Sequence, residues 1–365
     1  MLQSALRICS ELMPNFLAGL LLMGLWAPGA VAQTVPADIA EVSIEDLFAS
    51  NVVTREERAR GSKRWHLAYR YLRSDYDEYR SGTRRLSYED VLWSGPTEPR
   101  TDQNYPVVPT EISQEVHSLL AAYDFSPSLS FKLSVPFIEQ STDHISIVPN
   151  YDEFNISSNG IGDVVALADY EVSRTVNSSL RVVAGVSIPT GSIDEEGDTP
   201  RAAGDQQLPY TMQIGSGTWD LPAALVFEKF EQFVRWGGDV RAVVRTGTND
   251  RDYRLGHKFS LGSWVAFNNL DRFEPGIRLR YRWQDTISGS DGSLLLPNPR
   301  FPYPAPVVDP SAFGGQQVDL ALFMSFDLGS DWAIRAEYSK PIWLNLNGPQ
   351  SAENYHFSIG VSTTF

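Results

Sequence analysis

The segment Leu129-Ser130-Phe131-Lys132-Leu133-Ser134-Val135 alternates strictly between apolar and polar side chains. Its odd-numbered positions are apolar and its even-numbered positions are polar. Because successive side chains of a β-strand point to opposite faces, this pattern predicts a strand with one apolar and one polar face. An α-helix would need an apolar repeat of three to four residues, which the segment lacks.

The same alternation recurs along the chain and is bounded by turn residues. Examples are Trp65–Tyr71, Leu180–Ile188, Trp219–Phe227 and Ile277–Trp283, which alternates with three arginines. We count twelve such segments, with approximate centres at residues 69, 117, 133, 167, 184, 223, 241, 261, 280, 322, 337 and 359. After the first 32 residues, no stretch of about 18 continuous apolar residues follows, so no transmembrane helix is predicted.

The connections between the segments alternate in length. Short turns are expected near 124–128, 173–178, 229–233, 268–272 and 328–331. Long connections are expected near 75–110, 139–159, 190–214, 286–316 and 345–353, with a shorter one near 247–253. Short turns on one side and long loops on the other are typical of membrane barrels. A sheet in hydrocarbon must also close, since its edges find no hydrogen-bond partner there.

The sequence therefore predicts an all-β fold, a transmembrane antiparallel up-and-down β-barrel of about 12 strands over residues 63–365. Residues 139–159, 190–214 and 286–316 are expected on the outside. We expect Leu133, Val182, Leu225, Val240 and Leu322 to face lipid near the middle of the bilayer. A soluble β-sandwich with similar alternation is the alternative fold.

The first 32 residues have the pattern of a signal peptide. An apolar run from Phe16 to Trp26 precedes Ala30-Val31-Ala32, a small-x-small cleavage pattern. Cys9, the single cysteine, is removed with this segment, which leaves no thiol chemistry to the mature chain. Residues 33–62 are expected to form a periplasmic segment with a short helix near Val42–Phe48. The expected location is the bacterial cell outer membrane.

The charge and the aromatic content limit the binding partners that are expected for this protein. The 365 residues include 45 acidic and 30 basic side chains, a formal charge of −15, which disfavours binding to nucleic acid. Tryptophans near strand ends suit the girdles at membrane interfaces: Trp65, Trp219, Trp236, Trp283 and Trp332. Outer-membrane lipid and lipopolysaccharide are the expected surroundings. The final aromatic strand, ending in Phe365, resembles the signal read by the barrel-insertion machinery.

The polar face of the strands is expected to line the interior. Its charged members include Arg235, Arg241, Arg245, Lys258, Arg278, Arg280, Arg282, Asp163, Asp319 and Glu337. The strands near 241, 261 and 280 are consecutive, so their cations should form one basic wall. Two interpretations remain open: a charged eyelet that selects solutes, and a network of salt bridges that fills a narrow barrel.

Three motifs in residues 160–228 carry a resemblance to a known family. They are Gly160-Ile161-Gly162-Asp163-Val164, Ser187-Ile188-Pro189-Thr190-Gly191-Ser192, and Leu208-Pro209-Tyr210 continuing through Gly215, Gly217 and Asp220. Together they resemble the outer-membrane barrel family named after the meta-pathway of phenol degradation, a family of transporters. The resemblance implies passive passage of small hydrophobic or aromatic compounds. The glycines also have a local reason, since they permit tight turns and bulges at a barrel rim.

Other classes of function are also compatible with parts of the sequence. A structural or adhesive barrel without transport is the main alternative. His144-Ile145-Ser146, with Asn150 and Asn155 nearby, resembles the His-x-Ser pair of outer-membrane phospholipase, but the surrounding residues do not match, so no enzyme activity is expected. The histidines show no metal-ligand spacing, and no metal or cofactor is predicted. Whether the acidic loop at 194–205 binds calcium is left open; its spacing is not that of an EF-hand.

Overall fold

The computed structural model describes residues 65–268 and 270–365. The predicted signal peptide (1–32), the segment 33–62 and its short helix lie outside the described residues. No helix in the described part of the chain is long and apolar enough to cross a bilayer.

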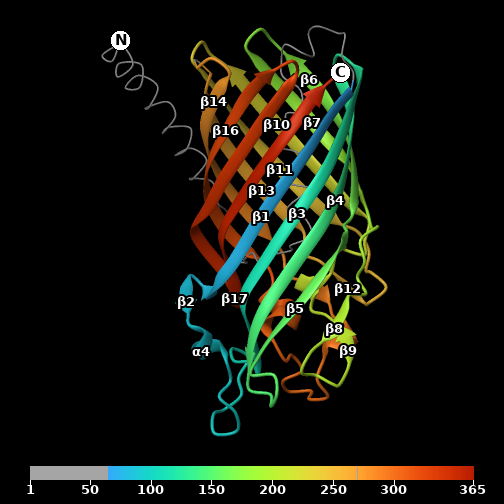
Figure 1. The fold of residues 1–365 in the computed structure, drawn as a ribbon, viewed down its shortest axis with the longest axis vertical. Coiled ribbons are helices and arrows are strands. Elements are labelled where there is room, and N and C mark those ends of the chain that lie inside the picture. The colour runs from blue at the N-terminus through green and yellow to red at the C-terminus, as the bar shows by residue number, and fades with distance from the viewer. Residues whose placement is uncertain (1–64, 269) are drawn as a thin grey trace, which may run out of the picture. The chain divides into compact units, whose positions relative to one another are not determined.

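The described residues form an almost entirely β structure (Figure 1). The barrel strands are β1 (Trp65–Gly82), β3 (Val107–Ser126), β4 (Leu129–Ser146), β5 (Glu153–Ile161), β6 (Val164–Arg174), β7 (Ser178–Ile188), β10 (Asp220–Phe230), β11 (Val234–Arg245), β13 (Lys258–Phe267), β14 (Phe273–Gln284), β16 (Gly315–Gly329) and β17 (Trp332–Thr364). The connections hold short elements: β2 (Arg84–Leu86), α4 (Tyr88–Val91), β8 (Glu196–Asp198), β9 (Asp205–Gln207), β12 (Tyr253–Arg254), β15 (Ser288–Gly289), and the 3₁₀ turns η2 (Tyr210–Met212), η3 (Gly292–Leu294), η4 (Pro306–Val308) and η5 (Pro310–Ala312).

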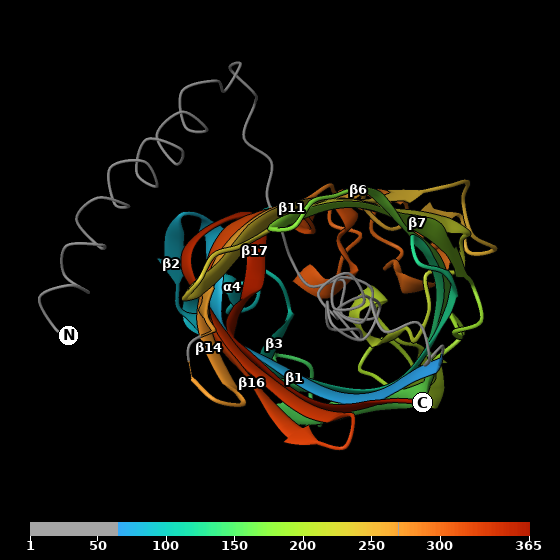
Figure 2. The same ribbon diagram turned by 90° about the horizontal axis from the view of Figure 1, so that it is seen from above.

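The sheet closes through the pairing of β17 with β1. Eleven strands follow one another around the ring, each antiparallel to the next, while β2 and β5 are additional strands. Figure 2 shows the closed ring seen along the barrel. The ends of the chain meet as well, because the backbones of Trp65 and Phe365 exchange two hydrogen bonds of 3.1 and 3.0 Å.

The long strand β17 contributes two consecutive strands to the barrel wall. Its residues 332–346 pair antiparallel with β16, and its residues 346–364 pair antiparallel with β1. Nine antiparallel pairings lead from β1 to β16, so these two strands run in opposite directions. The two parts of β17 therefore also run in opposite directions, with a reversal near Gly348, whose φ is +47°. Counting β17 as two strands gives a barrel of twelve strands, which confirms the predicted strand number.

Strands β5 and β6 together form one strand of the barrel wall, which Gly162 and Asp163 interrupt. Strand β4 pairs with both of them, through residues 137–145 and residues 129–134. All twelve predicted centres lie in strands, and all five short turns occur where they were expected.

Three of the expected long connections are shorter than predicted. Around the connection expected near 75–110, β1 extends to Gly82 and β3 begins at Val107. Residues 139–146 and 153–159 continue β4 and β5 as a paired hairpin, which leaves only 147–152 as the turn. Residues 345–353 lie within β17. In these places hydrogen-bonded pairing continues beyond the apolar band, so a change in side-chain character did not mark the strand end.

The outward face of the barrel is apolar. Leu133, Val182, Leu225, Val240 and Leu322 are all exposed, while their neighbours along each strand are partly or fully buried. Exposed tryptophans lie towards both ends of the wall, with Trp65 and Trp332 at the short-turn end and Trp219 at the other. Trp236 and Trp283, which were also expected in the girdles, are half-buried.

This facing assignment is tested by Leu133→Arg. An arginine at the middle of the bilayer costs about 2–4 kcal/mol in membrane barrels. We expect a loss of that size in equilibrium unfolding from lipid vesicles. Ser157→Arg is the matched control, because Ser157 also faces outward but lies beyond the apolar band on β5. Equal losses in the two variants would contradict the assignment.

Candidate functional site: the barrel interior

A chain of alternating charges follows the inner wall of the barrel near its short-turn end. Asp169 on β6 bridges Lys132 on β4 at 2.9 Å and Arg181 on β7 at 2.7 Å. Arg181 also lies 3.9 Å from Glu228 on β10, and Arg235 on β11 lies 3.4 Å from the same glutamate. Arg235 then pairs with Glu274 on β14. The side chains of Lys132, Asp169 and Arg181 are almost fully buried.

A second group of ion pairs lies on the neighbouring strands. Arg241 contacts Asp239 at 2.7 Å, and Arg278 contacts Glu337 at 2.6 Å. Further along, Arg282 contacts Asp319 and Glu353, each at 2.6 Å, and Arg245 contacts Asp220 at 2.5 Å. The basic wall is thus interleaved with carboxylates, as in the salt-bridge interpretation of the sequence.

The predicted interior residues fall into three sets. Arg241, Arg245, Arg280 and Asp319 are buried on the inner face. Arg235, Lys258, Arg278, Arg282 and Glu337 are partly buried on the same face. Asp163 differs, because it belongs to the anchor of a loop, described below, and not to the charged wall.

Part of the inner wall is apolar, which was not predicted from the sequence. One cluster contains buried inward side chains from β3, β6, β7, β10 and β11: Leu120, Val165, Leu167, Val183, Ala224, Val226 and Val243. The signal was present in Val164-Val165-Ala166-Leu167, a run that is apolar on both faces. In a membrane barrel, a run of this kind combines one apolar face towards lipid with one apolar face towards the interior.

A cavity of about 120 Å³ lies between these two kinds of wall. Its apolar lining includes Leu120 and Val226, and its charged lining comprises Arg70, Arg181, Arg235, Arg241, Arg278 and Arg335 with Glu228, Asp239, Glu274 and Glu337. Six cations against four carboxylates give these described residues a net formal charge of +2, although the whole chain carries −15. The lining is therefore both apolar and net cationic.

Two aromatic side chains support the cations of this lining. Arg235 lies over the ring of Trp264 at 4.8 Å, and Arg278 lies over Phe323 at 5.2 Å. Both aromatic residues point inward, on β13 and β16. Such cation–π contacts hold a guanidinium in place without neutralising it.

The loop 189–219 folds back against the inner wall, and the three family motifs meet at its base. Asp163 accepts hydrogen bonds from the backbone N–H groups of Gly191 and Ser216, both at 2.9 Å, and from the Ser216 hydroxyl at 2.7 Å. The Thr190 hydroxyl donates to the Gly162 carbonyl and accepts from the Val164 N–H. Asp163 thus ties together both ends of the loop.

Glycine is required where the two ends of this loop touch. A Cβ atom on Gly191 would lie 2.6 Å from the Cα of Gly215, and one on Gly215 would lie 2.3 Å from the Gly191 carbonyl oxygen. The contact brings Ile214 into a buried cluster with Leu72, Val116 and Ile138 on the inner faces of β1, β3 and β4. The remaining motif residues lie along the same loop or its base: Gly160, Pro189, Pro209, Tyr210, Gly217 and Asp220.

The inner loops form an apolar layer at the long-loop end. Tyr210 on η2 packs with Tyr253, Phe313 and Val307 from the following connections, and with Tyr76 on β1. The Tyr210 hydroxyl accepts the backbone N–H of Asp291 at 3.0 Å, and burial raises the pKa of this tyrosine. This layer narrows the interior at one end.

The hydrolase alternative gains no support from the geometry. His144 and Ser146 lie on β4, where His144 hydrogen-bonds the Thr142 carbonyl and Ser146 accepts the N–H of Val148. The His144 ring stacks on Phe154 at 4.6 Å, and burial lowers its pKa to about 4.

In the acidic loop at 194–205, Asp194 pairs with Arg251 and Asp198 accepts a hydrogen bond from Tyr151.

The fold and its interior define a structural class: a closed barrel of twelve antiparallel strands, with β17 counted twice, an apolar outer face and a charged inner face.

No protein-family model matches the sequence, and no curated protein matches it. Among solved structures, the chain is similar to an outer-membrane channel from Pseudomonas putida F1, at 13% identity and a TM-score of 0.53, over 83% of this chain and 96% of that one.

Two further solved structures are more distantly similar. A FadL homologue of Pseudomonas aeruginosa has 10% identity and a TM-score of 0.40, over 83% of this chain and 90% of its own. A KdgM porin has 9% identity and a TM-score of 0.39, over 82% and 99%. The Pseudomonas putida channel shares the fold of this chain.

The chain of alternating charges, which we call the interior ladder, is tested by Asp169→Asn. This change removes the carboxylate that Lys132 and Arg181 share, and breaking a buried pair typically costs about 3–5 kcal/mol. Glu231→Gln is the control, since the Lys229–Glu231 pair is exposed and such pairs contribute about 0–1 kcal/mol. Urea unfolding in lipid vesicles measures both. Equal stability of the two variants would contradict the burial of the ladder.

The loop anchor is tested by Gly191→Ala. The added methyl group collides with Gly215 and with the carbonyl of Ile214. Loop 189–219 should therefore detach from the inner wall. We expect faster tryptic cleavage after Arg201, which lies on this loop. Gly292→Ala is the control, because its Cβ meets no atom within 4 Å and its φ is not positive. Unchanged cleavage in Gly191→Ala would contradict the proposed anchor.

Proposed function

We propose that this protein is an outer-membrane channel that passes small apolar or aromatic solutes, and aromatic carboxylates in particular. The observation that carries the proposal is the mixed lining of the interior cavity. An aromatic ring can lie against Leu120 and Val226, while its carboxylate faces the excess of arginines. A confined cationic wall raises the local concentration of anions.

The membrane location is part of the same proposal. A continuous belt of exposed large apolar side chains surrounds the barrel, and in water such a surface would drive association. The shared fold with an outer-membrane channel supports the same location. Lipid and lipopolysaccharide are the proposed surroundings, the predicted signal peptide directs export, and Phe365 is the proposed contact of the insertion machinery.

The motifs around Asp163 support the resemblance to the phenol meta-pathway barrel family. Residues of all three motifs lie along one loop or at its base, so they act as a single structural unit. A unit of this kind explains why the three motifs occur together. Membership of that family, and hydrophobic uptake with it, is our proposal.

A structural barrel without transport is the second candidate. The ion pairs around Asp169 and the apolar layer around Tyr210 favour it, because both occupy the interior. The two candidates differ in one measurable property, which is flux through the folded barrel.

Flux of benzoate and of neutral benzamide into proteoliposomes tests the proposal. Arg278→Gln lowers the net charge of the lining by one, so benzoate flux should fall about two- to tenfold while benzamide flux stays near wild type. The double variant Arg278→Gln with Glu337→Gln is the matched control. It removes the same 2.6 Å ion pair but preserves the net charge, so the benzoate preference should return.

Two outcomes would overturn the proposal. If folded wild-type protein passes neither solute faster than protein-free liposomes do, the barrel is structural. If benzoate and benzamide fall equally in Arg278→Gln, the cationic lining does not select anions.

A further inference from the structure

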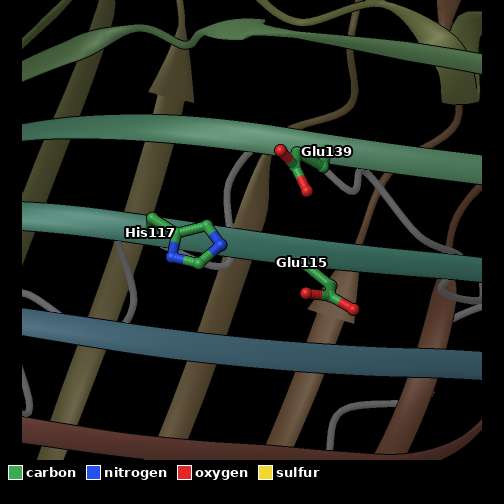
Figure 3. A group of neighbouring side chains, drawn as sticks. All are labelled: Glu115, His117 and Glu139. Atoms are coloured by element: carbon green, nitrogen blue, oxygen red, sulfur yellow. The ribbon is translucent and has the colours of Figure 1, made fainter.

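Three potential metal ligands gather on the outer wall of the barrel, away from the interior. Glu115 and His117 lie on β3, and Glu139 lies on β4 (Figure 3). One ligand atom from each residue lies within 4.8 Å of the others. It is the one group of three such residues found in the described part of the chain.

The strand register creates this cluster. Glu115 and Glu139 are direct partners in the β3–β4 pairing, and His117 follows on the same face of β3. Like charges directly opposite each other in an antiparallel pair are destabilising. A bound cation would turn this repulsion into shared coordination.

His117 is oriented by a neighbour. The hydroxyl of Tyr69 on β1 lies 2.7 Å from its Nδ1 atom. When Nδ1–H donates to that oxygen, the lone pair is on Nε2, and Figure 3 shows one ring nitrogen turned towards the two carboxylates. A second partner that fixes the ring and its tautomer is the usual arrangement around a ligating histidine.

The local charge suits a divalent ion. Arg73 on β1 pairs with Glu115 and with Asp75, each at 2.9 Å. Glu139 has no ion-pair partner among the described residues. One guanidinium against Asp75, Glu115 and Glu139 gives a net formal charge of −2.

The cluster lies where the apolar band of the outer wall ends. Leu119 is the next outward residue after His117 on β3, and Phe137 is the outward residue before Glu139 on β4; both are exposed and apolar. Charges at such a boundary are less well solvated than in bulk water, so attraction between the carboxylates and a cation is stronger there.

We propose that Glu115, His117 and Glu139 form a binding site for one divalent transition metal, with Zn²⁺ as the best match. Imidazole nitrogen with carboxylate oxygen is a zinc ligand set, and three protein ligands leave a coordination position for water. Calcium and magnesium favour all-oxygen sites, so His117 selects against them. The third ligand comes from a neighbouring strand, which is why spacing along the sequence did not reveal the site.

Calorimetric titration with Zn²⁺ tests the proposal. The protein is used without a histidine tag, treated with a chelator and held in detergent micelles. We expect one equivalent to bind to wild type, and the affinity to fall at least about tenfold in both Glu139→Gln and His117→Asn. Glu111→Gln is the matched control, because Glu111 is an acidic residue on the same face of β3 outside the cluster. It should bind as wild type does.

A second readout separates ligation from damage to the fold. Substitution with Co²⁺ should give visible absorption bands in wild type and Glu111→Gln, and weaker bands in Glu139→Gln. Heat-modified electrophoretic mobility verifies that each variant is a folded barrel. Absence of stoichiometric Zn²⁺ binding by folded wild type, or equal affinity of wild type and both site variants, would overturn the proposal. Neither result depends on whether the barrel transports solutes.

Discussion

The pairing of β17 with β1 is the constraint on which the rest of the structure depends. Every backbone N–H and C=O group that faces hydrocarbon needs a partner within the protein, and an open sheet edge cannot supply one. Closure through antiparallel pairs alone requires an even number of crossings. The reversal of β17 near Gly348 supplies the twelfth, and the hydrogen bonds between Trp65 and Phe365 complete the seam at the ends of the chain.

Closure also decides where the charges lie. Once the sheet is a ring, alternation places one half of the side chains outside and the other half inside. The inner half contains both cations and carboxylates, and Asp169 shows how these are accommodated, with two buried cations on one carboxylate. The inner wall also carries apolar side chains on the same strands as the charges, since Val183 and Arg181 both lie on β7, and Val243 and Arg241 both lie on β11. This mixed lining is the basis of the proposed selectivity.

The sequence predicted the facing of residues better than the ends of strands. Period-two alternation placed Leu133 outside and Arg241 inside, because the direction of a side chain in a strand is a local property. The extension of β4 to Ser146 was missed, since its outward residues become polar beyond the apolar band while the backbone pairing continues. Contacts between distant segments were missed as well. Nothing in the spacing of Asp163 and Ser216 shows that they bond, and Glu139 reaches His117 only through strand register.

The proposed function requires that the barrel interior conducts ions and prefers anions. The most direct test is the reversal potential of the purified protein in a planar lipid bilayer under a potassium chloride gradient. The proposed open interior predicts a finite conductance, and the net charge of +2 on the described lining predicts a reversal potential of the sign for chloride selectivity. A potassium-selective reversal potential, or no conductance from folded protein, would contradict an anion-preferring channel.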